Sequence, residues 1–117
     1  MAQVQPWTHK AIELAPAVLK HLLIWAPSGV ALSRDTLCNR VGCSDRVLRA
    51  AVVELRRQGH LVIADGSGGY RLARNADEVA AYTASLKSRV RALREIIDVM
   101  EGAAEQRFCQ LGQMERL

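Results

Sequence analysis

The chain has 117 residues, half of them apolar, and a formal net charge of +4. This length is enough for one compact domain with an appended helix and too short for a second hydrophobic core. No basic stretch followed by an apolar run and a cleavage site opens the chain, and the apolar run 15–26 is too short to span a bilayer. Because three cysteines also suit reduced thiols better than disulfides, we expect a cytoplasmic protein.

The first main helix is predicted from Pro16 to Ala26, behind an N-terminal arm formed by residues 1–15. Proline fits the first turn of a helix and interrupts its interior, so we start the helix at Pro16 and allow only a short turn at residues 9–14. The sequence Pro27-Ser28-Gly29 ends the helix. Its core-facing residues are expected to be Val18, Leu19, Leu22, Leu23 and Trp25.

Two further helices, joined by a tight turn, are expected between Ser33 and Gln58. Ser33 is a suitable N-cap for a short helix over residues 34–40, and Ser44 for a helix over residues 45–58. Gly42 permits the left-handed backbone that a tight turn between helices needs. Gly59 is expected to end the second of these helices.

The helix over residues 45–58 has two distinct faces. Its core stripe, at 100° per residue, consists of Leu48, Ala51, Val52 and Leu55. The opposite face places small apolar side chains among arginines, as a helix that enters the DNA major groove requires. This face predicts base contacts by Arg46, Arg49, Ala50 and Val53, with Arg56 and Arg57 on phosphates. A charged face that contacts nothing in particular is the alternative.

A β-hairpin is predicted after Gly59. Its strands are expected at residues 61–64 and 70–72, around a turn at residues 65–69 with three glycines. Such a small, mobile turn can lie close to a sugar-phosphate backbone or a minor groove. A plain hairpin that closes the core is the alternative.

This order of elements resembles the winged helix-turn-helix DNA-binding family over residues 16–74. The resemblance rests on a small residue at Cys38, Gly42 in the turn, an apolar residue at Cys43, the capping Ser44 and a branched apolar residue at Leu48. Family members more often have alanine and valine where the two cysteines stand. The resemblance implies a mostly α fold with a small β-hairpin. Backbone contacts to DNA are accordingly expected from Ser44, Arg56, Arg57, Arg71 and Arg74.

Positive charge is concentrated in the same segment. Residues 33–74 hold eight arginines against four acidic residues, so this segment carries the whole net +4 of the chain. A positive field over a helix-turn-helix suits a polyanionic partner.

A long amphipathic helix is predicted over residues 75–117, capped by Asn75. One small domain cannot cover its whole apolar stripe, so we expect a homodimer through this helix, with packing on the first helix as the alternative. The sequence Gly102-Ala103-Ala104 is expected to interrupt it, and Lys87, Arg91 and Arg94 to form a solvated basic stripe. The predicted dimer interface consists of Val79, Tyr82, Leu86, Val90, Leu93, Ile97 and Met100.

No catalytic constellation is recognisable, and we expect neither an enzyme nor a cofactor or metal. Cys38, Cys43 and His60 match no common zinc-ligand spacing. The function that fits best is sequence-specific binding of double-stranded DNA by a dimeric transcriptional regulator, similar in layout to small regulators of bacteria and prophages. The alternative is a winged-helix module that docks a protein partner or assembles a replication complex.

Overall fold

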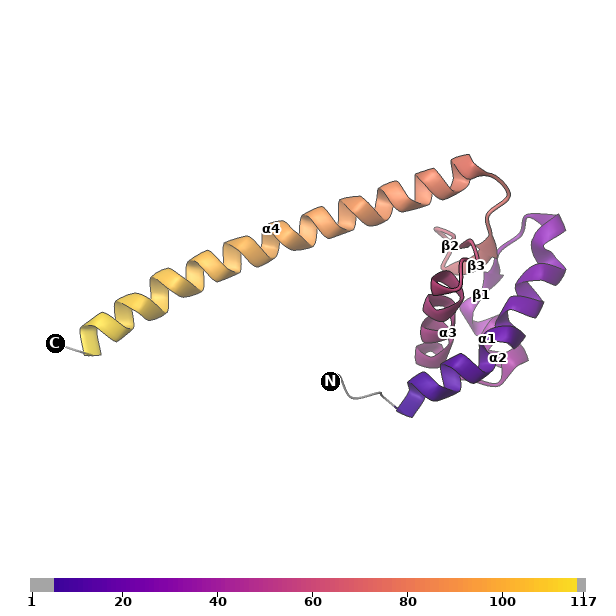
Figure 1. Cartoon of the computed structure of the whole chain (residues 1–117), viewed down its shortest axis with the longest axis horizontal. Coiled ribbons are helices and arrows are strands. Elements are labelled where there is room, and N and C mark those ends of the chain that lie inside the picture. Colours follow the sequence, from indigo (N-terminus) through magenta and orange to yellow (C-terminus); the bar gives the residue numbers. More distant parts are fainter. Residues whose placement is uncertain (1–5, 116–117) are drawn as a thin grey trace. The chain divides into compact units, whose positions relative to one another are not determined.

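The computed structural model describes the backbone of residues 6–115 and the side chains of residues 7–109. It is mostly helical, with a small three-stranded antiparallel sheet in the order β1-β3-β2 and a long C-terminal helix, which confirms the predicted fold class. Two compact units divide after Tyr82. The elements are α1 (Pro6–Trp25), the 3-10 turn η1 (Ala26–Ser28), β1 (Leu32–Ser33), α2 (Arg34–Val41), α3 (Asp45–Arg57), β2 (Val62–Ala64), β3 (Gly69–Leu72) and α4 (Ala76–Glu115) (Figure 1).

The core of the first unit lies mainly between α1 and α3. The predicted stripe of α3 is confirmed, since its members are at most 1% exposed. Leu37 of α2 and Val62 of β2 complete the same cluster. The buried residues of the two long helices are Ala11, Ala15, Val18 and Leu22 in α1 and Val47, Leu48, Ala51, Val52 and Leu55 in α3.

The first helix begins at Pro6, ten residues before the predicted start, so the expected arm over residues 1–15 is wrong from residue 6 onward. Proline lacks the N–H that would reach the carbonyl of Ile12, but Pro16 and Ile12 are both exposed, so water can hydrate that carbonyl. Burial of Ala11 and Ala15 on the same stripe as Val18 and Leu22 offsets the cost of the proline. The first five residues of the predicted arm lie outside the described residues.

Two residues predicted to face the core from α1 do not. Leu23 is 55% exposed and Trp25 is 37% exposed, because the stripe that packs on α3 runs through Ala15, Val18 and Leu22 instead. The indole of Trp25 packs against the guanidinium of Arg40, whose central carbon lies 5.5 Å from the ring centroid.

The helix-turn-helix forms as predicted. The Ser33 side chain accepts a hydrogen bond from the backbone N–H of Thr36 at 3.1 Å, and Ser44 accepts one from Val47 at 3.3 Å, so both serines cap their helices. Gly42 adopts a φ of 78° at the end of α2, where its N–H donates to the carbonyl of Cys38.

The hairpin forms one strand pair of a sheet that has an additional strand. Strands β2 and β3 pair antiparallel with Val62 opposite Leu72, and β1 pairs with the other edge of β3 with Leu32 opposite Tyr70. The sequence analysis missed β1 because it has only two residues. A Cβ on Gly69 would lie 2.6 Å from the carbonyl oxygen of Leu32, so this close pairing requires glycine.

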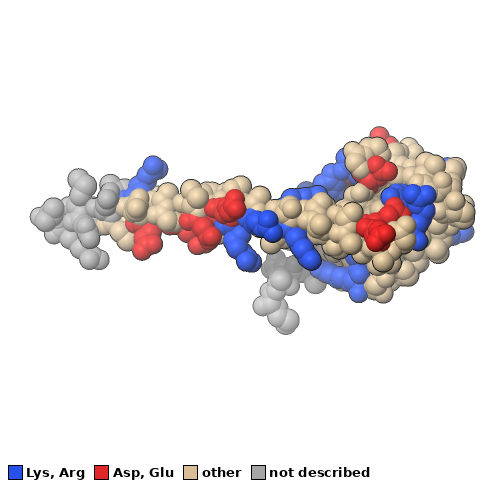
Figure 2. Space-filling view, turned by 90° about the horizontal axis from the view of Figure 1, so that it is seen from above, with Lys and Arg blue, Asp and Glu red and all other residues tan. Residues whose placement is uncertain are grey.

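The long helix α4 is continuous through Gly102, so the expected interruption is wrong. One glycine costs about 1 kcal/mol relative to alanine, which a 40-residue helix with flanking alanines tolerates. Figure 2 shows uncharged surface interspersed with basic and acidic side chains along this helix. Of the predicted interface, Val79, Tyr82 and Leu86 are partly buried, whereas the later members, Val90, Leu93, Ile97 and Met100, are each more than half exposed.

Candidate nucleic-acid interface

The four residues predicted to contact bases line one surface groove. This groove has a volume of about 510 Å³ and runs along the outward face of α3. Val53 is 42% exposed, whereas Ala50 is partly buried and allows close approach to the helix backbone. The lining residues are Arg46, Arg49, Ala50 and Val53, together with Trp7 and Asp45.

Trp7 is a member of this groove that the sequence analysis missed. It comes from the first turn of α1, in a segment that was expected to be an arm. Its indole is partly exposed and also packs against the core cluster. The signal that could have found it is the alanine spacing Ala11 and Ala15, which extends the core stripe of α1 back toward Trp7.

The exposed arginines of α3 are in two different states. The guanidinium of Arg49 pairs with the Asp45 carboxylate at 2.8 Å and remains 58% exposed, and Arg34 approaches the same carboxylate at 3.7 Å. Arg46 and Arg57 are exposed, and no ion pair within 4.0 Å involves either of them in the described part of the chain. Arg49 is thus paired within α3, whereas the exposed side chains of Arg46 and Arg57 take part in no ion pair among the described residues.

Arg56 is engaged within the protein. Its Nε donates to the carbonyl oxygen of Val62 at 2.9 Å, and a terminal nitrogen donates to the hydroxyl of Tyr82 at 2.8 Å. The guanidinium also lies 5.1 Å from the centroid of the Tyr82 ring. These contacts join the end of α3 to β2 and to the beginning of α4. Because the guanidinium of Arg56 is already bonded within the protein, we do not expect it to bind a phosphate.

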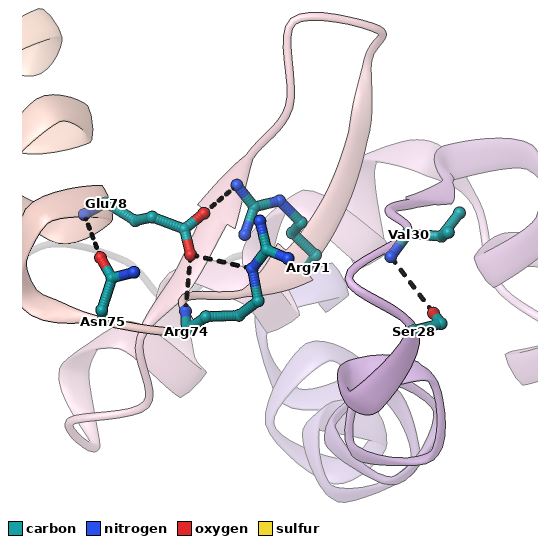
Figure 3. A network of polar contacts seen from close by, with 6 residues as sticks. All are labelled: Ser28, Val30, Arg71, Arg74, Asn75 and Glu78. Carbon is teal, nitrogen blue, oxygen red and sulfur yellow. Dashed lines mark hydrogen bonds and ion pairs between the residues drawn. The ribbon is translucent and has the colours of Figure 1, made fainter.

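Arg71 and Arg74 converge on Glu78 in the first turn of α4 (Figure 3). Arg71 forms an ion pair with this carboxylate and is only 18% exposed, and one of its terminal nitrogens is buried without a hydrogen-bond partner. Arg74 donates to Glu78 from its backbone N–H at 2.9 Å and from Nε at 3.2 Å, yet its side chain is 62% exposed. Of these two arginines, Arg74 therefore presents the accessible positive charge.

Glu78 stays ionised over a wide pH range. The hydrogen bond from Arg71, followed by that from the backbone of Arg74, lowers the pKa of this carboxyl to about 2. The Glu78 backbone N–H donates to the side-chain oxygen of Asn75 at 2.9 Å, which confirms Asn75 as the N-cap of α4. The ion pair of Arg71 thus attaches β3 to the first turn of α4.

The thiol of Cys38 is not activated as a nucleophile. Burial raises the pKa of the Cys38 thiol, and the neighbouring Cys43 raises it further, so Cys38 stays protonated. Among the residues that the structure describes, no three His, Cys, Asp or Glu side chains could hold a metal ion together. Within the same part of the chain, no helix has the length and apolar character needed to cross a membrane.

Comparisons with known proteins add little. No protein-family model matches the chain, and no curated protein matches its sequence. Among solved structures, IscR from T. potens is similar over 91% of this chain and 91% of that chain, with 19% sequence identity and a TM-score of 0.35. A TM-score of 0.35 is too low to show a shared fold or function.

Proposed function

We propose that this protein binds double-stranded DNA sequence-specifically, as a small dimeric transcriptional regulator of the cytoplasm. The observation that carries the proposal is the groove on α3, where Arg46 and Arg49 flank the small apolar residues Ala50 and Val53. A helix that reads bases needs this combination, since small side chains allow close approach and arginine can donate two hydrogen bonds to guanine.

The proposal gives the arginines of α3 different roles according to their position along the helix. Arg49, held by Asp45, and Arg46, at the beginning of α3, would read base edges, because base contacts come from the N-terminal turns of a recognition helix. Ala50 and Val53 would contact thymine methyl groups. Arg57 would bind a phosphate.

The other residues predicted to contact the DNA backbone fall into two groups. Arg74 keeps an exposed guanidinium and stays a candidate phosphate contact, as does the exposed Ser44 at the beginning of α3. Arg56 and Arg71 have intramolecular partners, so we assign them the task of holding α3 and the hairpin against the start of α4.

The exposed apolar residues of α4 support a homodimer. Val90, Leu93, Ile97 and Met100 are 51–66% exposed in the single chain, and a regular apolar stripe of this length is stabilised when a second helix covers it. Two recognition helices in one dimer would enter successive major grooves about one helical turn apart.

Binding measured against salt concentration tests the proposal. Fluorescence anisotropy with labelled genomic duplexes should give an affinity that falls steeply as ionic strength rises, by about 0.9 log units per log unit of salt for each phosphate contacted. Arg57→Ala should weaken binding to all duplexes alike and reduce the salt slope by about 1 per site, or about 2 for the dimer.

Lys20→Ala is the matched control. It also removes one exposed positive charge, but from α1 and not from α3, the proposed recognition helix, so it should leave the slope unchanged. Absence of any binding to duplex DNA at low salt would reject the proposal in favour of a protein-docking module.

A further inference from the structure

Charge is segregated along the exposed part of α4. Residues 87–94 contain four basic and no acidic side chains, whereas residues 95–105 contain four acidic and no basic ones. Figure 2 shows the blue and red groups in succession along the helix. The basic residues are Lys87, Arg89, Arg91 and Arg94, and the acidic ones are Glu95, Asp98, Glu101 and Glu105.

The apolar stripe of the same segment has a symmetric spacing. It consists of Leu86, Val90, Leu93, Ile97, Met100 and Ala104. From residue 86 to residue 104, its members are separated alternately by four and three positions, and the pattern reads the same in both directions about Glu95. Two such helices in antiparallel orientation, with Glu95 at the twofold axis, bring every stripe residue opposite another. The facing pairs are Leu86 with Ala104, Val90 with Met100 and Leu93 with Ile97.

We infer that the α4 helices of two copies pair antiparallel in this register. The inference rests on the proposed function, because it specifies the dimer on which that function depends. In the antiparallel pair, the basic block of each helix lies along the acidic block of the other. A parallel pair would place basic against basic and acidic against acidic, and like charges along a helix interface are destabilising.

One ion pair is specific to this arrangement. Lys87 and Glu101 follow directly after the stripe residues Leu86 and Met100, so both lie at the same edge of the stripe. Antiparallel pairing brings Lys87 close to the partner's Glu101, and symmetry forms this contact twice. In a parallel pair the two residues would be separated by about 21 Å along the axis. Arg94 lies near its own copy at the twofold axis, where Asp98 of the same helix is spaced to offset the repulsion.

This register sets the distance between the two points at which the DNA-binding units join the paired helices. Residues at position 82, where the first unit ends, would be separated by about 39 Å along the paired helices. Recognition helices in successive major grooves on one side of DNA are about 34–36 Å apart. The antiparallel pair therefore supplies attachment points at a spacing that suits two half-sites one turn apart.

Distances between spin labels test the orientation in the full chain. Positions 88, 95 and 109 are separated by seven and fourteen residues, that is by whole heptads, so they share one side of the helix, away from the stripe, and Cys109 is a natural labelling site. Labels would be placed singly by Ser88→Cys, Glu95→Cys or native Cys109, with the remaining cysteines replaced (Cys38→Ala, Cys43→Val, and Cys109→Ser where needed). Pulsed electron paramagnetic resonance then measures the separation across the dimer.

Antiparallel pairing predicts three different distances. Along the helix axis, the two labels should be separated by about 0 Å at residue 95, about 21 Å at residue 88 and about 42 Å at residue 109. Because the lateral separation is similar at all three positions, the distance between labels should rise in that order. Equal distances at all three positions would overturn the inference in favour of a parallel pair. A mass of one chain, about 12.9 kDa, by light scattering across the micromolar range would overturn it as well.

Charge reversal gives an independent readout. Glu101→Lys should weaken dimerisation about tenfold, because two attractions become two repulsions, and Lys87→Glu in the same chain should restore it. A double variant as weak as the single one would contradict the register. The DNA affinity of wild-type protein, measured on the same samples, separates the outcomes: bound DNA with parallel helices rejects the register alone, whereas no bound DNA rejects the proposed function.

Discussion

Gly69→Ala should destabilise the first unit through a single backbone contact. The new methyl carbon would lie 2.6 Å from the carbonyl oxygen of Leu32 and 3.0 Å from its carbonyl carbon, both shorter than van der Waals contact permits. Relief requires β1 to move away from β3, which disrupts their pairing at Ser33 and Gly69. Overpacking of this kind costs about 1–3 kcal/mol. For a domain of this size we therefore expect the melting temperature to fall by about 10 °C.

Urea unfolding followed by tryptophan fluorescence is the suitable assay. Trp7 and Trp25 both belong to α1, so the signal reports the first unit and not the exposed part of α4. Gly66→Ala is the matched control, because nothing lies within 4 Å of its added carbon and its φ is not positive, and it should change the free energy of unfolding by less than about 0.5 kcal/mol. If Gly69→Ala unfolds at the wild-type urea concentration, the close β1–β3 pairing is refuted.

Two further predictions concern capping and pH. Ser44→Ala should lower the free energy of unfolding by about 1 kcal/mol in urea, because the N–H of Val47 loses its acceptor, whereas Ser67→Ala should have little effect; equal effects would contradict the capping role. Since the pKa of Glu78 falls from 4.5 to about 2 on folding, its charge stabilises the fold above about pH 4.5, and this contribution is lost as the pH falls toward 2. The difference in free energy of unfolding between wild type and Glu78→Gln should therefore decrease over that range. A difference that stays constant down to pH 2 would count against the Arg71–Glu78 pair.

Features set by local chemistry were predictable from the sequence. The caps at Ser33 and Ser44 and the left-handed Gly42 depend on neighbouring residues, and the buried stripe of α3 follows from helical spacing. Each of these is decided within one or two turns of helix, so the pattern of residues contains the answer.

Features set by tertiary contact were not predictable. The start of α1 depends on packing against α3, which outweighs the local preference of Pro16 for a first turn. Arg56 and Arg71 each have a partner in α4, and Arg56 has a second one in β2. Neither the helix angle nor the position in the hairpin could therefore show whether these arginines contact a phosphate or the protein itself. The base contacts assigned to Arg46, Arg49, Ala50 and Val53 stay predictions.

Selection of bound sequences from a random duplex pool tests the central claim most directly. Wild-type protein should enrich one motif with two symmetry-related halves about one helical turn apart. The double variant Arg46→Ala and Arg49→Ala should bind DNA in a salt-dependent manner but lose most of that enrichment, since each base-reading arginine is worth about 1–3 kcal/mol of discrimination. A wild-type pool that remains random after repeated rounds at low salt would contradict the account.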